Sequence, residues 1–217
     1  MIRVGGANKM AKIHYPNGKK NQSFASLPDR MKAEEFLGMF KKNSSAAGRG
    51  MSLEEDVNET NAFYVSNEIA SVHKKPTPVQ IVKVDYPNRS AAVIREAYFR
   101  QPSTTDYNGI YEGRHLDFEA KETANKTALP LSNFHEHQIK HMGLVCRHKG
   151  ISFAIIRFTC HNETYLLDAG HIISFWEQAD KGGRKSIPYT YIKEYGHLIP
   201  LGLHPRLDYL KVIREHY

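Results

Sequence analysis

An aspartate followed thirteen residues later by a Glu-x-Lys triplet is the pattern in this sequence best suited to chemistry: Asp106, Glu119 and Lys121. If the two acids face each other across paired strands, they repel unless a cation lies between them. Carboxylate and hydroxyl oxygens suit Mg²⁺, which keeps positions open for a substrate phosphate. The Lys121 ammonium could orient a water or offset charge on that phosphate. The pattern therefore predicts metal-dependent phosphodiester hydrolysis.

A β-hairpin is the element that must position these groups. Strand alternation puts Asp117, Glu119 and Lys121 on one face and leaves the intervening apolar side chains for the core. A turn at residues 112–113 would place Asp106 opposite Glu119 and Thr104 opposite Lys121. Asn108-Gly109 is a stronger turn signal, but a turn there would leave only a stub of first strand. We therefore expect a bulge near residue 108, which could shift the pairing by one. Ordinary surface strands also carry Glu and Lys two residues apart, so the triplet alone is equally compatible with a strand that has no catalytic role.

The helix predicted over 133–150 offers a further metal ligand. Gln138, Met142 and Val145 have the i, i+4, i+7 spacing of one helix face, which we expect to turn toward the sheet. From that face Gln138 could reach the metal. It could equally cap a sheet edge or bond to the backbone.

Two other residue types could bind metal, and both are disfavoured. His137 and His141 lie four apart, as a zinc pair requires, but the residue four after His135 is Ile139, so the H-E-x-x-H motif is absent. Cys146 and Cys160 have no paired ligand spacing, and we expect both to be core thiols.

The rest of the chain predicts a mixed α/β layout. Ser52 and Glu55 form a capping box that begins a helix. "QIVKV" predicts a strand and "SAAVIREAYF" a short helix, while the apolar "ISFAIIRFT" predicts a central strand followed by a second in "ETYLLDA". We expect one sheet flanked by helices, with peripheral helices and loops from about residue 174 to the end.

Charge divides the chain into an arm and a domain. The net charge is +7, and residues 1–50 hold ten Lys/Arg against three Asp/Glu, while residues 51–217 are balanced at 20 against 20. We expect a flexible basic N-terminal arm over 1–50, which favours a polyanionic partner, and a folded domain over 51–217. No apolar run is long enough for a membrane span, and the N-terminus lacks a signal-peptide core, so we expect no membrane contact and a cytoplasmic protein.

A second basic stretch lies inside the domain. Pro76, Pro78 and Pro87 break it into short pieces, and its composition suits phosphate contacts and base stacking. An ordinary surface hairpin is the alternative. The residues of this basic stretch that we predict to bind DNA are Lys74, Lys75, Lys83, Arg89, Arg95, Tyr98, Phe99 and Arg100.

Together these segments resemble a known family. "GRGMSLEEDVNETN", "HKKPTPVQIVKVDYPNRSAAVIREAYFRQPSTTDYNGIYEGRHLDFEAKET" and "NFHEHQIKHM" closely resemble the RecU family of bacterial Holliday junction resolvases. The likeness runs from about Arg49 to Arg157 and continues more loosely through "GGRKSI" and "PRLDYLKVI". Residues 1–12 precede the "YPNGK" with which we would expect the family to begin, and we assign them no function.

The resemblance implies a restriction-endonuclease-like fold and a homodimer that cleaves four-way DNA junctions symmetrically with Mg²⁺, for which Mn²⁺ can substitute. It also implies a role in recombination, repair and chromosome segregation, and modulation of the RecA recombinase. A projecting stalk, here about 79–101, would enter the junction centre. The implied metal ligands are Thr104, Asp106, Glu119 and Gln138, the transition-state lysine is Lys121, and the matching basic residues include Arg49, Lys74 and Arg89.

Two other functions share parts of this evidence. A restriction or repair endonuclease acting on linear duplex would need the hairpin but no stalk. A non-enzymatic binding or regulatory module would need neither metal nor cleavage. Cleavage of an immobile junction with Mg²⁺, beside a linear duplex and a metal-free control, separates the three.

Overall fold

The structure is a computed structural model that describes residues 52–86, 92–100 and 104–217. The arm predicted over 1–50 lies outside these ranges, as do Arg49 and Arg89. No helix within the described ranges is long and apolar enough to cross a membrane.

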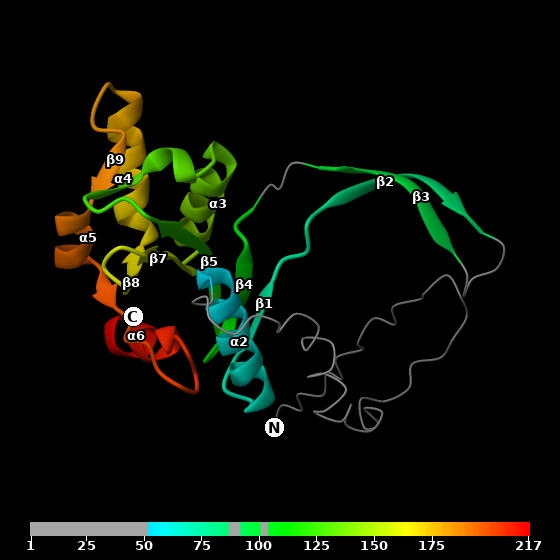
Figure 1. The fold of residues 1–217 in the computed structure, drawn as a ribbon, viewed down its shortest axis with the longest axis horizontal. Helices are drawn as coiled ribbons and strands as arrows, with labels where there is room; N and C mark the ends of the chain where they lie inside the picture. Colours follow the sequence, from blue (N-terminus) through cyan, green and yellow to red (C-terminus); the bar gives the residue numbers. More distant parts are fainter. Residues whose placement is uncertain (1–51, 87–91, 101–103) are drawn as a thin grey trace, which may run out of the picture. The chain divides into compact units, whose positions relative to one another are not determined.

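A six-stranded mixed sheet forms the centre of the domain (Figure 1). Its strands follow the order β1-β4-β5-β7-β8-β10, and every neighbouring pair is antiparallel except β5 and β7, which are parallel. These strands are β1 (Ser71–Lys74), β4 (Tyr107–Tyr111), β5 (Arg114–Thr123), β7 (Ile151–Phe158), β8 (Glu163–Asp168) and β10 (His197–Leu198).

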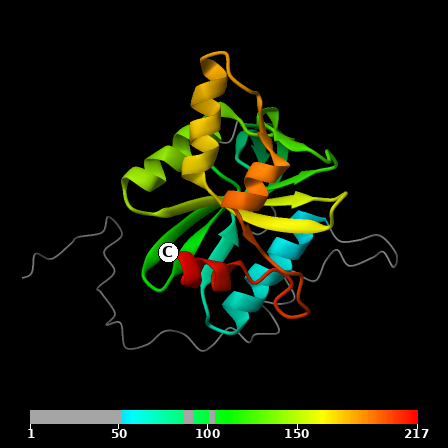
Figure 2. The same cartoon turned by 90° about the vertical axis from the view of Figure 1, so that its left-hand side faces the viewer.

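Helices cover both faces of this sheet, as Figure 2 shows. One face packs against α2 and α6, and the other against α3, α4 and α5. The elements outside the sheet are α2 (Leu53–Ser66), β6 (Ala128–Pro130), η2 (Leu131–Asn133), α3 (Glu136–Arg147), α4 (Ala169–Asp180), β9 (Ser186–Pro188), α5 (Tyr189–Tyr195) and α6 (Tyr209–His216). The predicted α/β class, a mixed sheet flanked by helices, is confirmed, and it agrees with the restriction-endonuclease-like fold that the resemblance implied.

Strand alternation divides the core between the two faces. β7 is buried along its whole length, as predicted for a central strand; Phe153 and Ile155 face α2 and α6, while Ala154 and Ile156 face α3 and α4. In β5, Phe118 lies on the first of these faces and stacks on Phe153, with ring centroids 4.7 Å apart. Glu119 consequently points toward the face that carries α3.

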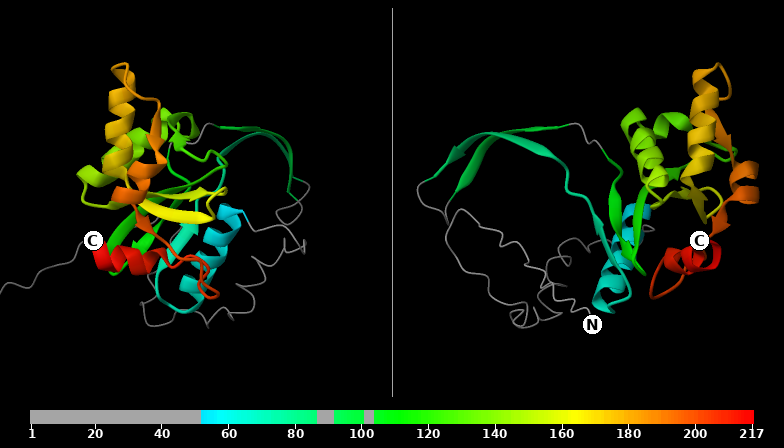
Figure 3. Two further views of the ribbon diagram at one scale, coloured as in Figure 1. Left: turned by 60° about the vertical axis from the view of Figure 1, so that its left-hand side comes forward. Right: turned by 180° about the vertical axis from the view of Figure 1, so that it is seen from behind.

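The helix at the start of the domain is confirmed at its predicted boundary. Ser52 accepts a hydrogen bond from the Glu55 backbone N–H, and Glu55 accepts one from the Ser52 N–H at 2.8 Å. The end of the chain contributes more to the core than expected, because α6 buries Tyr209, Leu210 and Ile213 against the sheet. Figure 3 shows α6 on the side of the sheet that also carries α2.

The β4–β5 hairpin has the predicted turn but not the predicted bulge. Glu112 (φ 47°) and Gly113 (φ 76°) form the turn, and Asn108 pairs with Asp117 in an unbroken register. Gly109 allows β1 and β4 to lie close together, because a Cβ at this position would lie 2.3 Å from the Ser71 carbonyl oxygen of β1. The glycine that resembled a turn signal is required by the neighbouring strand.

Two local predictions are wrong. Residues 90–99 were expected to form a helix, but β3 (Val93–Phe99) pairs antiparallel with β2 (Val79–Asp85) in a separate two-stranded sheet (Figure 3). Pairing with the β-branched β2 overrides the helical preference of this segment. Cys146 and Cys160 are exposed rather than core thiols, because Cys146 lies in the last turn of α3 and Cys160 in the turn after β7.

Candidate active site

The two predicted acidic residues meet where the β4–β5 ladder ends. The last pair of that ladder is Tyr107 with Phe118, so Asp106 and Glu119 occupy the next position across it. Their carboxyl groups are close enough for Asp106 to raise the pKa of Glu119. β4 begins at Tyr107, so Asp106 and Thr104 lie in the segment before the strand rather than on it as expected. The pairing of Asp106 with Glu119 is nevertheless the predicted one.

Glu119 is a buried acid in an environment that opposes its charge. Its side chain is fully buried, and burial raises its pKa to about 8; the Lys121 ammonium counteracts this, while Asp106 adds to it. Its Oε2 atom lies 3.0 Å from the Lys121 Nζ but has no hydrogen bond of good geometry. A divalent cation would satisfy this oxygen and offset the repulsion between the two acids.

The α3 helix brings Gln138 to the same place. Gln138, Met142 and Val145 are buried on one helix face, as their spacing predicted. The Gln138 Nε2 donates to Glu119 Oε1 at 2.5 Å, and its Oε1 accepts from the His135 backbone N–H at 2.9 Å. Two carboxylates and the nearby Thr104 hydroxyl form a donor set of hard oxygens, which fits Mg²⁺. The Gln138 amide presents its nitrogen to Glu119, so its oxygen would join this set only after the amide rotates.

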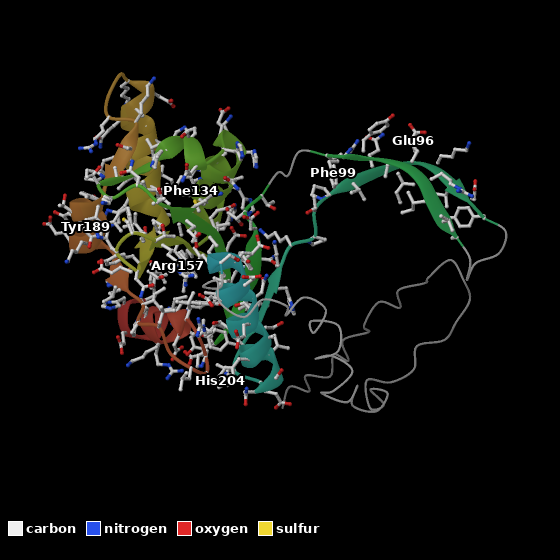
Figure 4. The ribbon with its side chains drawn as sticks, in the orientation of Figure 1. Glu96, Phe99, Phe134, Arg157, Tyr189 and His204 are labelled. Carbon is white, nitrogen blue, oxygen red and sulfur yellow. The ribbon has the colours of Figure 1, made fainter. Side chains whose placement is uncertain are left out.

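Lys121 lies two residues beyond Glu119 on the same face of β5. Its side chain is 15% exposed, and its Nζ lies 5.5 Å from the centroid of the Phe134 ring. Figure 4 labels Phe134, which comes from the short segment before α3. The ammonium is thus held beside the carboxylates with access to solvent on one side.

A cavity of about 280 Å³ adjoins these groups. Thr104 and Asp106 line it together with Glu54 from α2 and Lys74 and Lys75. It therefore combines the proposed metal-binding segment with basic side chains.

A second buried acid next to the site was not assigned a role by the sequence. Asp117 is 1% exposed; its Oδ2 accepts from the Lys75 Nζ at 2.7 Å and lies 3.1 Å from the His141 Nε2, and its Oδ1 accepts from the Thr105 hydroxyl. Alternation along β5 places Asp117 beside Glu119, but no local pattern identifies Lys75 as its partner, because 42 residues separate them. His141 is thus engaged by Asp117, and the described residues contain no group of three or more His, Cys, Asp or Glu arranged to hold a metal.

The predicted DNA-binding residues fall into three groups. Five of them are exposed on the β2–β3 hairpin: Lys83 in β2, Arg95, Tyr98 and Phe99 in β3, and Arg100 directly after β3. Figure 4 labels Phe99, whose side chain is 84% exposed. Lys74 forms an exposed ion pair with Glu54 at 2.5 Å, whereas Lys75 turns inward to Asp117. Arg49 and Arg89 lie outside the described residues.

Comparison with known proteins assigns the chain to a family. Residues 48–215 match the family model described as RecU, Recombination protein U. A Holliday junction resolvase RecU of Bacillus cytotoxicus is 59% identical over 202 residues, covering 93% of this chain and 96% of the relative. Another of the same name from Bacillus cereus is 57% identical over 205 residues, covering 94% and 98%.

A solved structure shows a weaker likeness. The archaeal Holliday junction resolvase Hjc of Archaeoglobus fulgidus covers 69% of this chain and 95% of its own, with 8% identity and a TM-score of 0.39. The family model and the sequence relatives together cover nearly the whole described domain and its site. This chain belongs to the RecU family.

Proposed function

We propose that this protein resolves four-way DNA junctions by Mg²⁺-dependent, symmetric hydrolysis of phosphodiester bonds, with Mn²⁺ able to replace Mg²⁺. Its RecU relatives are named Holliday junction resolvases. The observation that carries the metal-dependent chemistry is the buried Glu119, whose raised pKa and unsatisfied oxygen lie beside Asp106 and Lys121. A linear-duplex nuclease is the alternative that the test must exclude.

The residues of the candidate site would have two separate roles, metal binding and stabilisation of charge on the phosphate. Asp106 and Glu119 would hold the metal with the Gln138 amide and the Thr104 hydroxyl, and the bound ion would polarise the scissile phosphate and activate a water. Lys121 would offset the negative charge that develops on the phosphate, since its ammonium is already fixed beside Glu119.

Junction selectivity is assigned to the β2–β3 hairpin and the basic arm. The hairpin exposes both aromatic and basic side chains, a composition that can contact phosphates and stack on unpaired bases. Arg49 and Arg89 would add phosphate contacts.

The remaining parts of the proposal rest on family membership. Symmetric cleavage of two strands requires two equivalent sites, which a homodimer supplies. We propose that this homodimer acts in the cytoplasm in recombination, repair and chromosome segregation, and that it modulates RecA.

The test compares an immobile four-way junction with a linear duplex of the same arm sequence, at one salt concentration, with Mg²⁺ and with EDTA. Wild-type protein should cut the junction in Mg²⁺ only, and at paired positions on opposite strands. Asp106→Asn should abolish cutting yet keep junction binding in a gel-shift assay, because affinity comes mainly from phosphate contacts elsewhere. Equal cutting of both substrates would favour the linear-duplex nuclease, and undiminished cutting by Asp106→Asn would refute the site.

A further inference from the structure

A buried ion pair between Lys75 and Asp117 contacts the segment that carries two of the candidate metal ligands. The Lys75 Nζ is 2.7 Å from the Asp117 Oδ2, and their side chains are 19% and 1% exposed. The histidine ring of His141 contacts the same carboxylate oxygen at 3.1 Å, and His115 approaches it at 3.9 Å. The pair is part of the folded interior and not a solvated surface contact.

Lys75 is bonded to the ligand-bearing segment through both its backbone and its side chain. Its N–H donates to the Asp106 carbonyl oxygen at 2.7 Å, and its Nζ donates to the Thr105 hydroxyl at 2.9 Å. The Thr105 hydroxyl in turn donates to Asp117. Asp117, Lys75 and Thr105 therefore contact one another in a closed triangle. Thr105, which lies between Thr104 and Asp106, is fixed by this triangle.

No strand ladder holds that segment in place. β1 ends at Lys74, β4 begins at Tyr107, and residues 104–106 have no regular secondary structure. The two proposed ligands of this segment consequently depend for their positions on the backbone hydrogen bond from Lys75 to Asp106 and on the side-chain contacts of Thr105. The contacts of Lys75 extend the alignment of β1 and β4 past the last pair of their ladder, Lys74 with Tyr107.

We propose that Lys75 and Asp117 are positioning residues, which hold Thr104 and Asp106 in the geometry that the metal requires, and that Lys75 is not a DNA contact. This inference rests on the proposed metal site. The Lys75 ammonium already donates to two acceptors and its charge is matched by a buried carboxylate, so little of it remains to attract a phosphate. Groups that orient metal ligands typically change metal affinity or activity by ten- to a hundredfold when removed.

Lys74 is the matched comparison. It is the adjacent residue in the chain, its side chain is 40% exposed, and its partner Glu54 is 59% exposed. An exposed pair of this kind separates easily, so Lys74 remains available to a DNA phosphate.

The experiment measures metal and junction affinities separately for Lys75→Met and Lys74→Met. We expect calorimetric titration of the DNA-free protein to show Mn²⁺ binding weakened at least about tenfold in Lys75→Met and unchanged in Lys74→Met. We expect gel shifts in EDTA to show the reverse: junction affinity unchanged in Lys75→Met and reduced in Lys74→Met, with a smaller salt slope. Cleavage by Lys75→Met should need correspondingly more Mn²⁺ for half-maximal rate.

A double variant guards against simple misfolding, because removing Lys75 alone leaves Asp117 as a buried unpaired charge. Lys75→Met with Asp117→Asn removes both charges, so thermal unfolding should return toward the wild-type temperature while Mn²⁺ affinity stays low. Recovery of Mn²⁺ affinity together with stability would overturn the positioning role, as would a Lys75→Met protein with wild-type Mn²⁺ affinity and weakened junction binding. A wild-type protein that binds no Mn²⁺ and cuts without metal would overturn the metal site itself, a pattern distinct from either of these.

Discussion

Glu119 is a single side chain whose negative charge the folded protein opposes. Its pKa is raised from 4.5 to about 8, chiefly by burial. Between these two pH values the folded state binds more protons at this position than the unfolded chain does. The stability of the metal-free protein should therefore fall as the pH rises through that interval, and level off above it.

The substitution Glu119→Gln tests this directly, because glutamine keeps the shape and removes the charge. In EDTA at pH 8 the variant should unfold at higher temperature than wild type, with a gain on the order of 2 kcal/mol in free energy of unfolding. Well below pH 4.5 the difference should disappear, since Glu119 is then protonated in both the folded and the unfolded protein. Scanning calorimetry across pH makes the measurement. A variant less stable than wild type at pH 8 would show that Glu119 is ionised without cost.

Lys121 is the second single residue with a testable role, which we expect to be on the substrate phosphate and not on the metal. Lys121→Ala should reduce the single-turnover cleavage rate by about 10²- to 10³-fold, because the charge developing on the phosphate loses its fixed cation. Mn²⁺ should still bind, since an ammonium has no lone pair for a metal.

Lys140→Ala is the control for Lys121, because Lys140 is an exposed lysine of α3 paired with Glu136. Its cleavage rate should match wild type. Wild-type cutting by Lys121→Ala would reduce Lys121 to a structural residue.

At the scale of the element, Gly109 determines how closely β1 can approach β4. A Cβ at this position would lie 2.3 Å from the Ser71 carbonyl oxygen and 2.6 Å from the Val72 Cα, both backbone atoms that cannot move alone. Gly109→Ala should therefore lower the free energy of unfolding by at least ~2 kcal/mol. It should also slow cleavage, because β1 leads directly into Lys75.

Gly143→Ala provides the opposite expectation in the same measurement. A Cβ there meets only side-chain atoms at 3.7 and 3.8 Å, so the variant should be neutral or more stable by up to about 1 kcal/mol, as alanine favours a helix. Equal unfolding temperatures for Gly109→Ala and wild type would show that β1 adjusts without cost.

The same strand shows what the sequence could and could not predict. The turn at residues 112–113 and the pairing of Asp106 with Glu119 followed from alternation and strand length. The glycine in Asn108-Gly109 was misinterpreted because its requirement comes from β1, more than thirty residues earlier in the chain. β3 was misassigned for the same kind of reason, since its partner β2 decides its conformation. Gln138 was found because helix periodicity is local, whereas the Lys75–Asp117 contact was not.

At the scale of the whole molecule, we expect the β2–β3 hairpin to provide junction recognition and the main sheet domain to provide cleavage. Its two strands form their own sheet, and their side chains contribute to neither core cluster. Replacing residues 79–101 by a short Gly/Ser link should leave the domain folded and its Mn²⁺ binding intact. The variant should bind junction and linear duplex with similar affinity at fixed salt, and should cut junctions poorly.

The control for this replacement is the pair of point variants Tyr98→Ala and Phe99→Ala, which remove exposed rings without shortening the chain. A partial loss of junction preference is expected from each, on the order of 1–3 kcal/mol if the ring stacks on a base. Intact preference after the full replacement would assign selectivity to dimer geometry.

The stacked rings of Tyr107, Phe118 and Phe153 stabilise the core and also determine the register of β5. Because β5 alternates between core and site, slipping it by one residue would turn Phe118 toward α3 and force Asp117 and Glu119 among the aromatic rings. A mispaired molecule would then have neither a core nor a metal site. The stacked rings therefore link correct folding to activity: we expect cleavage only from molecules in which β5 has the register described above.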